Sequence, residues 1–129
     1  MSEMVDTETL TTTFAPLDQL PYEGGTKDDM GKLPMHLLPP EFLTGTAAVL
    51  DFGAKKYAPR NWERGLDYSR VFSALQRHMW AWWSGEGADS ETGMSHLWHA
   101  SCCLAFLVAY EARGTGHDDR PAALSEVEG

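Results

Sequence analysis

The sequence contains few basic residues, few cysteines and no long apolar run. Ten Lys and Arg residues stand against 19 Asp and Glu residues, which gives a formal net charge of −9. Such a balance argues against binding of a nucleic-acid polymer, because a protein that coats phosphates needs an excess of basic side chains on one face. A small anionic ligand would therefore need a local basic patch or a metal ion.

The two cysteines, Cys102 and Cys103, are neighbours in the sequence. A disulfide between adjacent residues is sterically poor, so we expect a reducing, intracellular environment. The sequence shows no basic and apolar leader, and no apolar run approaches the roughly 20 residues that a membrane span needs. We therefore expect a soluble, cytoplasmic protein without a membrane partner.

The sequence also shows no internal repeat and no convincing strand pattern, and its helical periodicities predict an all-α fold. With 129 residues, of which 43% are hydrophobic, the chain is long enough for one core. We expect a small bundle of three or four helices over residues 26–113. A flexible arm is expected over residues 1–25, and a disordered tail over residues 114–129.

Three helices are predicted from caps and apolar spacing. The first begins near Pro40 and stops before Pro59, the second runs from about Tyr68 to Gly85, and the third follows Ser95 to about Arg113. The expected buried stripe of the first helix comprises Leu43, Ala47, Leu50, Ala54 and Tyr57. That of the second comprises Val71, Leu75, His78 and Trp82, and the third helix carries His96, His99, Cys103, Phe106 and Tyr110 on one face.

Three prolines interrupt the apolar segment 31–40, which therefore cannot form a regular helix. The segment is predicted to form an extended strap against the core. The tryptophans Trp80, Trp82, Trp83 and Trp98 are too large for the interior of a three-helix monomer. They favour self-association, and we expect a homo-oligomer, either a dimer or a tetramer.

The stretch 77–99 contains metal-ligand chemistry beside large apolar side chains. His96 and His99 are three residues apart on one helix, a spacing that lets both imidazoles reach one ion. Both lie near a helix N-terminus, where the dipole favours the neutral imidazole that coordinates metal. The other candidates are His78 on the preceding helix and three loop carboxylates, Glu86, Asp89 and Glu91.

The identity of the ion depends on which ligands dominate. Carboxylates would favour Mg²⁺ or Mn²⁺, and imidazoles would favour Zn²⁺, Mn²⁺ or Fe. The alternative is that His78 is a core histidine bonded to a backbone group and His96 caps its own helix. In that case the acids are only solvated loop residues.

A basic segment precedes this stretch. Residues 55–77 contain six Lys or Arg residues and two acidic ones, which suits phosphate oxygens, and Trp62 or Tyr57 could stack on a base. The alternative is a solvated loop in which Trp62 fills the core. Lys32 and His36, in the proline-rich segment, give a weaker signal.

Several short motifs occur in an order that resembles the N-terminal family of phage dATP/dGTP diphosphohydrolases. They are Gly31-Lys32-Leu33-Pro34, His36-Leu37-Leu38-Pro39-Pro40-Glu41, Phe52-Gly53-Ala54-Lys55-Lys56-Tyr57, Arg60-Asn61-Trp62, Arg77-His78, Gly85-Glu86, Asp89-Ser90-Glu91-Thr92-Gly93 and Ser95-His96-Leu97-Trp98-His99-Ala100. The resemblance covers about residues 31–110. It implies a MazG-like, all-α pyrophosphohydrolase from a virus or prophage, which cuts a nucleoside triphosphate between its α and β phosphates in nucleotide-pool editing.

The resemblance implies a site that we assign residue by residue. A Mg²⁺ or Mn²⁺ cofactor would be held by Glu86, Asp89, Glu91, His96 and His99, and the catalytic residues would be Glu86, Asp89 and His78. The purine nucleotide would be bound by Lys32, Lys55, Lys56, Arg60, Asn61, Trp62 and Arg77. The protein would act in the cytoplasm of the host cell.

One departure separates this sequence from MazG-like enzymes, which usually carry Glu-x-x-Glu on one helix and Glu-x-x-Asp on the next. Here the second of these helices has His96 and His99, and the first has His78. Either histidines replace carboxylate ligands, or the metal sits elsewhere, or this branch only binds nucleotide. The runner-up hypothesis is accordingly a phage protein that sequesters a nucleotide or a nucleotide-derived immune signal without cutting it, and a third is a helical interaction module.

Overall fold

The computed structural model describes residues 23–121, and the regular secondary structure in that range is helical. Its elements are η3 (Met35–Leu37), α1 (Pro40–Lys56), η4 (Asn61–Arg64), α2 (Tyr68–Trp83) and α3 (His96–Arg113). Apart from two isolated bridges, Asp67 with His117 and Ala88 with Ser95, residues 23–121 form no β-structure. The all-α prediction is therefore confirmed. Contacts divide the chain into the units Met1–Pro34 and Met35–Gly129, and the second contains all the helices found in the described residues.

The helix ends follow the capping residues. Pro40 occupies the first position of α1, where its missing N–H costs nothing. The Ser95 hydroxyl accepts a hydrogen bond from Leu97 N at the start of α3. Gly114 ends α3 in the left-handed conformation, with φ 68°. These are the boundaries that the sequence predicted for α1 and α3, and α2 ends two residues before the expected Gly85.

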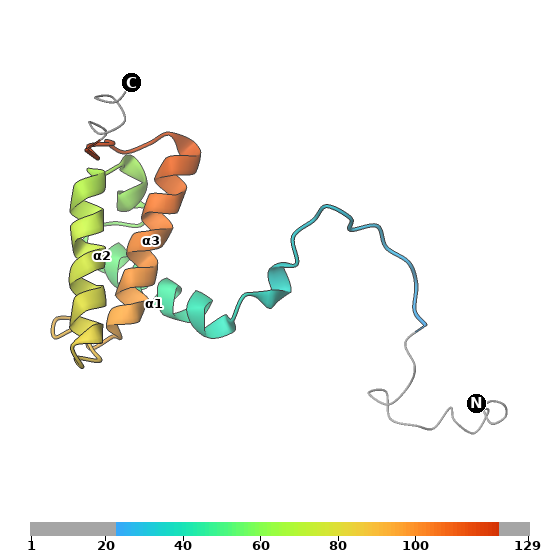
Figure 1. Ribbon diagram of the computed structural model, residues 1–129, viewed down its shortest axis with the longest axis horizontal. Helices are drawn as coiled ribbons and strands as arrows, with labels where there is room; N and C mark the ends of the chain where they lie inside the picture. Colours follow the sequence, from blue (N-terminus) through green and yellow to red (C-terminus); the bar gives the residue numbers. More distant parts are fainter. Residues whose placement is uncertain (1–22, 122–129) are drawn as a thin grey trace. The chain divides into compact units, whose positions relative to one another are not determined.

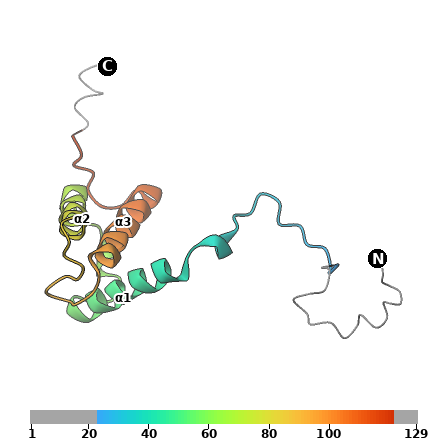
Figure 2. The same cartoon turned by 60° about the horizontal axis from the view of Figure 1, so that its bottom comes forward.

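The third helix is central to the bundle, since it contacts both α1 and α2. Figure 1 shows α2 and α3 side by side, and Figure 2 shows α1 running across this pair rather than along it. Tyr110 on α3 is fully buried and donates a hydrogen bond from its hydroxyl to the Trp62 carbonyl, at 2.6 Å. The Trp62 ring stacks on Phe106, with centroids 4.6 Å apart. The core therefore joins α3 to the loop that contains η4.

The contact between α1 and α3 depends on Gly45, which is the buried residue of α1. A Cβ atom built at Gly45 would lie 2.5 Å from Cδ1 of Trp98. The predicted apolar stripe of α1 was therefore wrong at its ends, because Leu43 and Tyr57 are 51% and 66% exposed. The helix packs through Gly45, which has no side chain, so the spacing of apolar residues does not predict this face.

Two further expectations differ from the structure. In the part of the proline-rich segment that belongs to the unit with the helices, Met35 and Leu37 are 65% and 70% exposed, so these two side chains do not pack against the core. The predicted tail is ordered at its beginning, where His117 N donates to Leu66 O and Tyr68 N donates to His117 O. The arm residues 1–22 and residues 122–129 of the predicted tail lie outside the described range.

The apolar surface of the single chain is large. Trp80 and Trp83 are 64% and 73% exposed, so the interior does not accommodate these two tryptophans. The expected oligomer stays a prediction. Within the described residues, no helix is long and apolar enough to cross a membrane.

The adjacent cysteines of α3 are free, with Cys102 buried and Cys103 half-buried. Burial raises the pKa of the Cys102 thiol to about 12 and that of the Cys103 thiol to about 11. Both thiols are therefore protonated near neutral pH.

Two glycines of α1 test the packing of this helix. Gly45→Ala should lower the free energy of unfolding, because overpacking against Trp98 costs about 1–3 kcal/mol and exceeds the gain in helix propensity, which is at most about 1 kcal/mol. Gly53→Ala is the matched control, since no atom lies within 4 Å of its added Cβ. It should raise stability. Urea unfolding of both variants measures the difference, and equal effects would contradict the close contact at Gly45.

Candidate functional site

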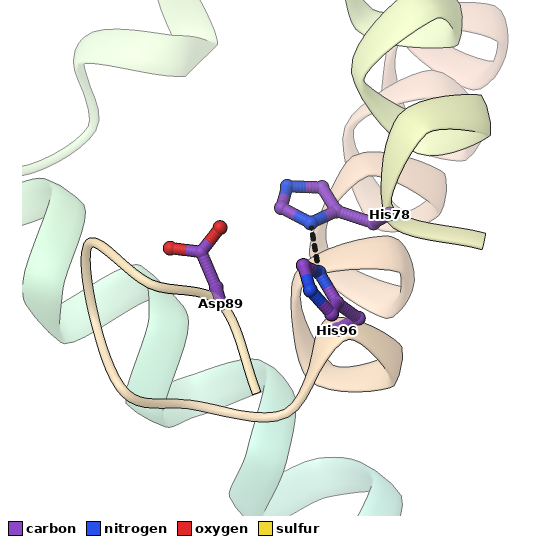
Figure 3. A group of neighbouring side chains, drawn as sticks. All are labelled: His78, Asp89 and His96. Atoms are coloured by element: carbon purple, nitrogen blue, oxygen red, sulfur yellow. Dashed lines mark hydrogen bonds between the residues drawn. The ribbon is translucent and has the colours of Figure 1, made fainter. Parts of the chain in front are cut away.

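A cluster of histidines and one aspartate lies where α2 ends and α3 begins. His78 projects from α2, His96 comes from the first turn of α3, and Asp89 comes from the loop between the helices (Figure 3). An atom of each residue lies within 4.8 Å of atoms of the other two. His99, one turn further along α3, stacks on His78 with ring centroids 4.6 Å apart. The sequence predicted this convergence, and the structure brings these four residues together.

Hydrogen bonds hold each imidazole. Nδ1 of His78 and Nδ1 of His96 are 2.9 Å apart, and Nε2 of His96 lies 3.0 Å from the Glu86 carboxylate. Nε2 of His99 lies 2.7 Å from the Thr92 hydroxyl. His78 is thus bonded to another histidine rather than to a backbone group. Ser95, and not His96, caps α3. The contacts therefore differ from the alternative interpretation, in which His78 bonds to a backbone group and His96 caps its own helix.

The loop between the helices is folded around Asp89. Its carboxylate accepts hydrogen bonds from Glu91 N and Thr92 N at 3.0 and 3.1 Å, and its backbone N–H donates to Met94 O at 2.8 Å. A side chain that binds its own loop in this way is fixed in direction. Thr92 was not among the site residues predicted from the sequence. Its position three residues after Asp89, a spacing typical of such turns, was the available signal.

The electrostatics favour the neutral forms of His78 and His99 beside an ionised Asp89. Burial, followed by the charge of His99, lowers the pKa of His78, and burial is also the first cause that lowers the pKa of His99. Burial alone would raise the pKa of Asp89, but hydrogen bonds from the Thr92 and Glu91 backbones and the nearby His99 lower it overall. These are the protonation states in which imidazole and carboxylate bind metal.

The donor geometry fits a divalent ion. Two nitrogen ligands that bind one ion at about 2.1 Å and at right angles lie about 3 Å apart. The Nδ1 atoms of His78 and His96 have this separation, so an ion could replace the proton of their hydrogen bond, and the Asp89 carboxylate supplies a third donor. Two other predicted ligands lie nearby. Glu86 contacts Nε2 of His96, and Nε2 of His99 lies 4.0 Å from the Asp89 carboxylate. Glu91 pairs instead with Lys56, at 2.8 Å.

Most of the predicted phosphate-binding residues are engaged elsewhere. Three of them form ion pairs, namely Lys55 with Asp51, Lys56 with Glu91 and Arg60 with Glu63. Trp62 is stacked in the core, as the alternative interpretation held, and Arg113 lies over its ring. Asn61 begins η4, and the exposed Lys32 belongs to the other unit of the chain. Arg77 lines a cavity beside the cluster.

The fold and this cluster define a class: an all-α protein with histidine and carboxylate donors at one helix junction. The chain belongs to the family of the N-terminal region of dATP/dGTP diphosphohydrolases, whose family model matches residues 22–120. This confirms the resemblance of the sequence motifs. The matched range includes every residue of the cluster.

A relative supports the same assignment. The chain is 36% identical over 96 residues to a dATP/dGTP diphosphohydrolase of Salmonella phage PMBT28. The matched residues are 74% of this chain but 33% of the relative, so the chain spans about a third of that protein. No solved structure matches the chain.

The pKa shifts predict an acid-sensitive cluster in metal-free buffer. The ordinary pKa of histidine is about 6.5, and those of His78 and His99 are lower in the folded chain. The unfolded chain therefore takes up protons first as the pH falls. The stabilising contribution is complete above about pH 6.5 and is lost as the pH falls through the folded-state pKa values. Denaturant unfolding in EDTA between pH 7.5 and 5.5 should show this loss. His78→Gln should reduce the pH dependence, and an equal dependence in both proteins would contradict the assignment.

Proposed function

We propose that this chain provides the metal-dependent site of a diphosphohydrolase that converts dATP or dGTP to the monophosphate and pyrophosphate. The observation that carries the proposal is the convergence of His78, Asp89 and His96 in a chain of this family. The activity named for the phage relative supports the choice of substrate. Because the chain has a net charge of −9, a triphosphate needs a cation at its binding site to offset the repulsion. As the relative is a phage protein, we further propose that the chain acts on the nucleotide pool in the host cytoplasm.

The residues of the cluster divide the work. A bound divalent ion neutralises phosphate charge and lowers the pKa of water. His78, Asp89 and His96 are the groups that would hold it. The Glu86 carboxylate accepts a hydrogen bond from Nε2 of His96 and so fixes the tautomer and the direction of that ring. Thr92 fixes His99, which stacks on His78 and limits its rotation.

The ligand set favours Mn²⁺ over Mg²⁺ as the cofactor. Mg²⁺ prefers oxygen ligands and retains several waters, whereas imidazole nitrogen suits transition metals. Two of the three converging donors are imidazoles. The carboxylates that MazG-like enzymes use are thus partly replaced, and the preference for the ion should change with them.

Activity is tested by incubating the purified chain with dATP or dGTP and Mn²⁺ or Mg²⁺ and measuring pyrophosphate and monophosphate. Asp89→Asn and His96→Ala should each reduce turnover about 100-fold or more, because even the partners of metal ligands contribute about 10–100-fold. Glu86→Gln should fall within that smaller range. Asp118→Asn, an exposed carboxylate outside the cluster, is the matched control. A wild-type chain that binds a deoxynucleotide but releases no pyrophosphate would instead be a sequestering protein.

Metal binding is tested separately by thermal unfolding. Mn²⁺ at 100 times its Kd should stabilise the chain by about 2.7 kcal/mol and raise Tm by several degrees. Mg²⁺ at the same concentration should have a smaller effect. His96→Ala should abolish the Mn²⁺ shift, whereas His36→Ala, an exposed histidine outside the cluster, should retain it. A shift that persists in His96→Ala would place the metal elsewhere.

A further inference from the structure

A cavity of about 510 Å³ lies between α2, α3 and the end of α1. Its volume is within the range of small-molecule sites, which is about 300–1,000 Å³. Arg70, Ser73 and Arg77 line it from one face of α2, and Tyr57 and Phe106 contribute aromatic rings. None of the described residues that line it is acidic. In a chain with a net charge of −9, a cavity lined by two arginines and no carboxylate is unusual.

The ion pairs of the chain single out the same arginines. Five of the ten basic side chains pair with a carboxylate of residues 23–121: Lys55, Lys56, Arg60, Arg113 and Arg120. Arg70 and Arg77 make no such pair among the described residues. A smaller cavity of about 270 Å³ shares Arg70 and Leu66 with the first and adds Arg64, but Asp67 also lines it. The larger cavity is therefore the one whose described lining carries arginines without a carboxylate.

The spacing of these donors suits a chain of phosphates. Arg70, Ser73 and Arg77 are at i, i+3 and i+7 and so share one helix face, over a length of about 10 Å. Guanidinium groups bind phosphate oxygens through paired hydrogen bonds, and a serine hydroxyl can donate another. Tyr57 is 66% exposed, so its ring is accessible to a purine.

The cavity and the histidine cluster are consecutive along the interface of α2 and α3. Cys103 lines the cavity one helical turn after His99, and Arg77 directly precedes His78. Of the two arginines, Arg77 is the nearer to the cluster along α2, so the reacting phosphate would lie at Arg77 and the rest of the ligand toward Arg70.

We infer that this cavity binds the phosphate chain of a purine deoxynucleotide through Arg70 and Arg77, with Tyr57 against the base. Arg70 is an addition to the predicted substrate-binding residues, and Tyr57 takes the place at the base that the sequence left open between Tyr57 and Trp62. The inference rests on the proposed function, because it places the substrate of the histidine cluster.

The test compares the affinities of the full chain for dATP, deoxyadenosine and inorganic triphosphate, by calorimetry in EDTA and again with Mn²⁺. Arg70→Gln and Arg77→Gln should each weaken binding of dATP and of triphosphate about tenfold or more, because each removes a charge-assisted hydrogen bond. Arg120→Gln removes the same charge outside the cavity and should change affinity less than about twofold. Tyr57→Leu should weaken dATP but not triphosphate. Thermal unfolding checks that each variant is folded.

The outcomes separate this inference from the proposed function. Equal affinities in all folded variants, or no binding of either phosphate ligand by the wild-type chain, would overturn the cavity assignment. Hydrolysis whose KM is unchanged in Arg70→Gln and Arg77→Gln would overturn it while leaving the proposed function intact. Arginine-dependent binding without any hydrolysis would sustain the cavity and overturn the function.

Discussion

Direct contact between imidazoles at the junction of α2 and α3 is the constraint around which the structure is arranged. His96 is only 4% exposed, yet its two ring nitrogens face His78 and Glu86 rather than an apolar wall. Burying a polar ring is tolerated only when its nitrogens are bonded. The loop around Asp89 and the register of the two helices must therefore be maintained together, since a shift of either helix would leave these nitrogens without partners.

The helices were predictable because their signals are local. Pro40, Ser95 and Gly114 set helix ends through backbone geometry that each residue imposes by itself. Packing was harder to predict, because it depends on residues distant in sequence. Gly45 is buried because the Trp98 ring covers it. Residues 115–119 are held by hydrogen bonds with Leu66 and Ser69.

The same distinction applies to the site. Helical spacing was sufficient to predict that His78, His96 and His99 converge, because all three lie on helices. It could not tell a basic residue that is available from one that is paired. Lys56 and Arg77 look alike in sequence, but the first faces Glu91 and the second lines a cavity. Whether a basic side chain is paired depends on where the acidic loop places Glu91, and the sequence pattern does not predict that conformation.

The thiols of α3 also bear on how the chain responds to oxidants. Cys103 is one helical turn from His99, on the helix that carries part of the histidine cluster. Because burial raises the pKa values of Cys102 and Cys103, little thiolate is present near neutral pH. Peroxide attacks the thiolate form, so both cysteines are slow targets for oxidation.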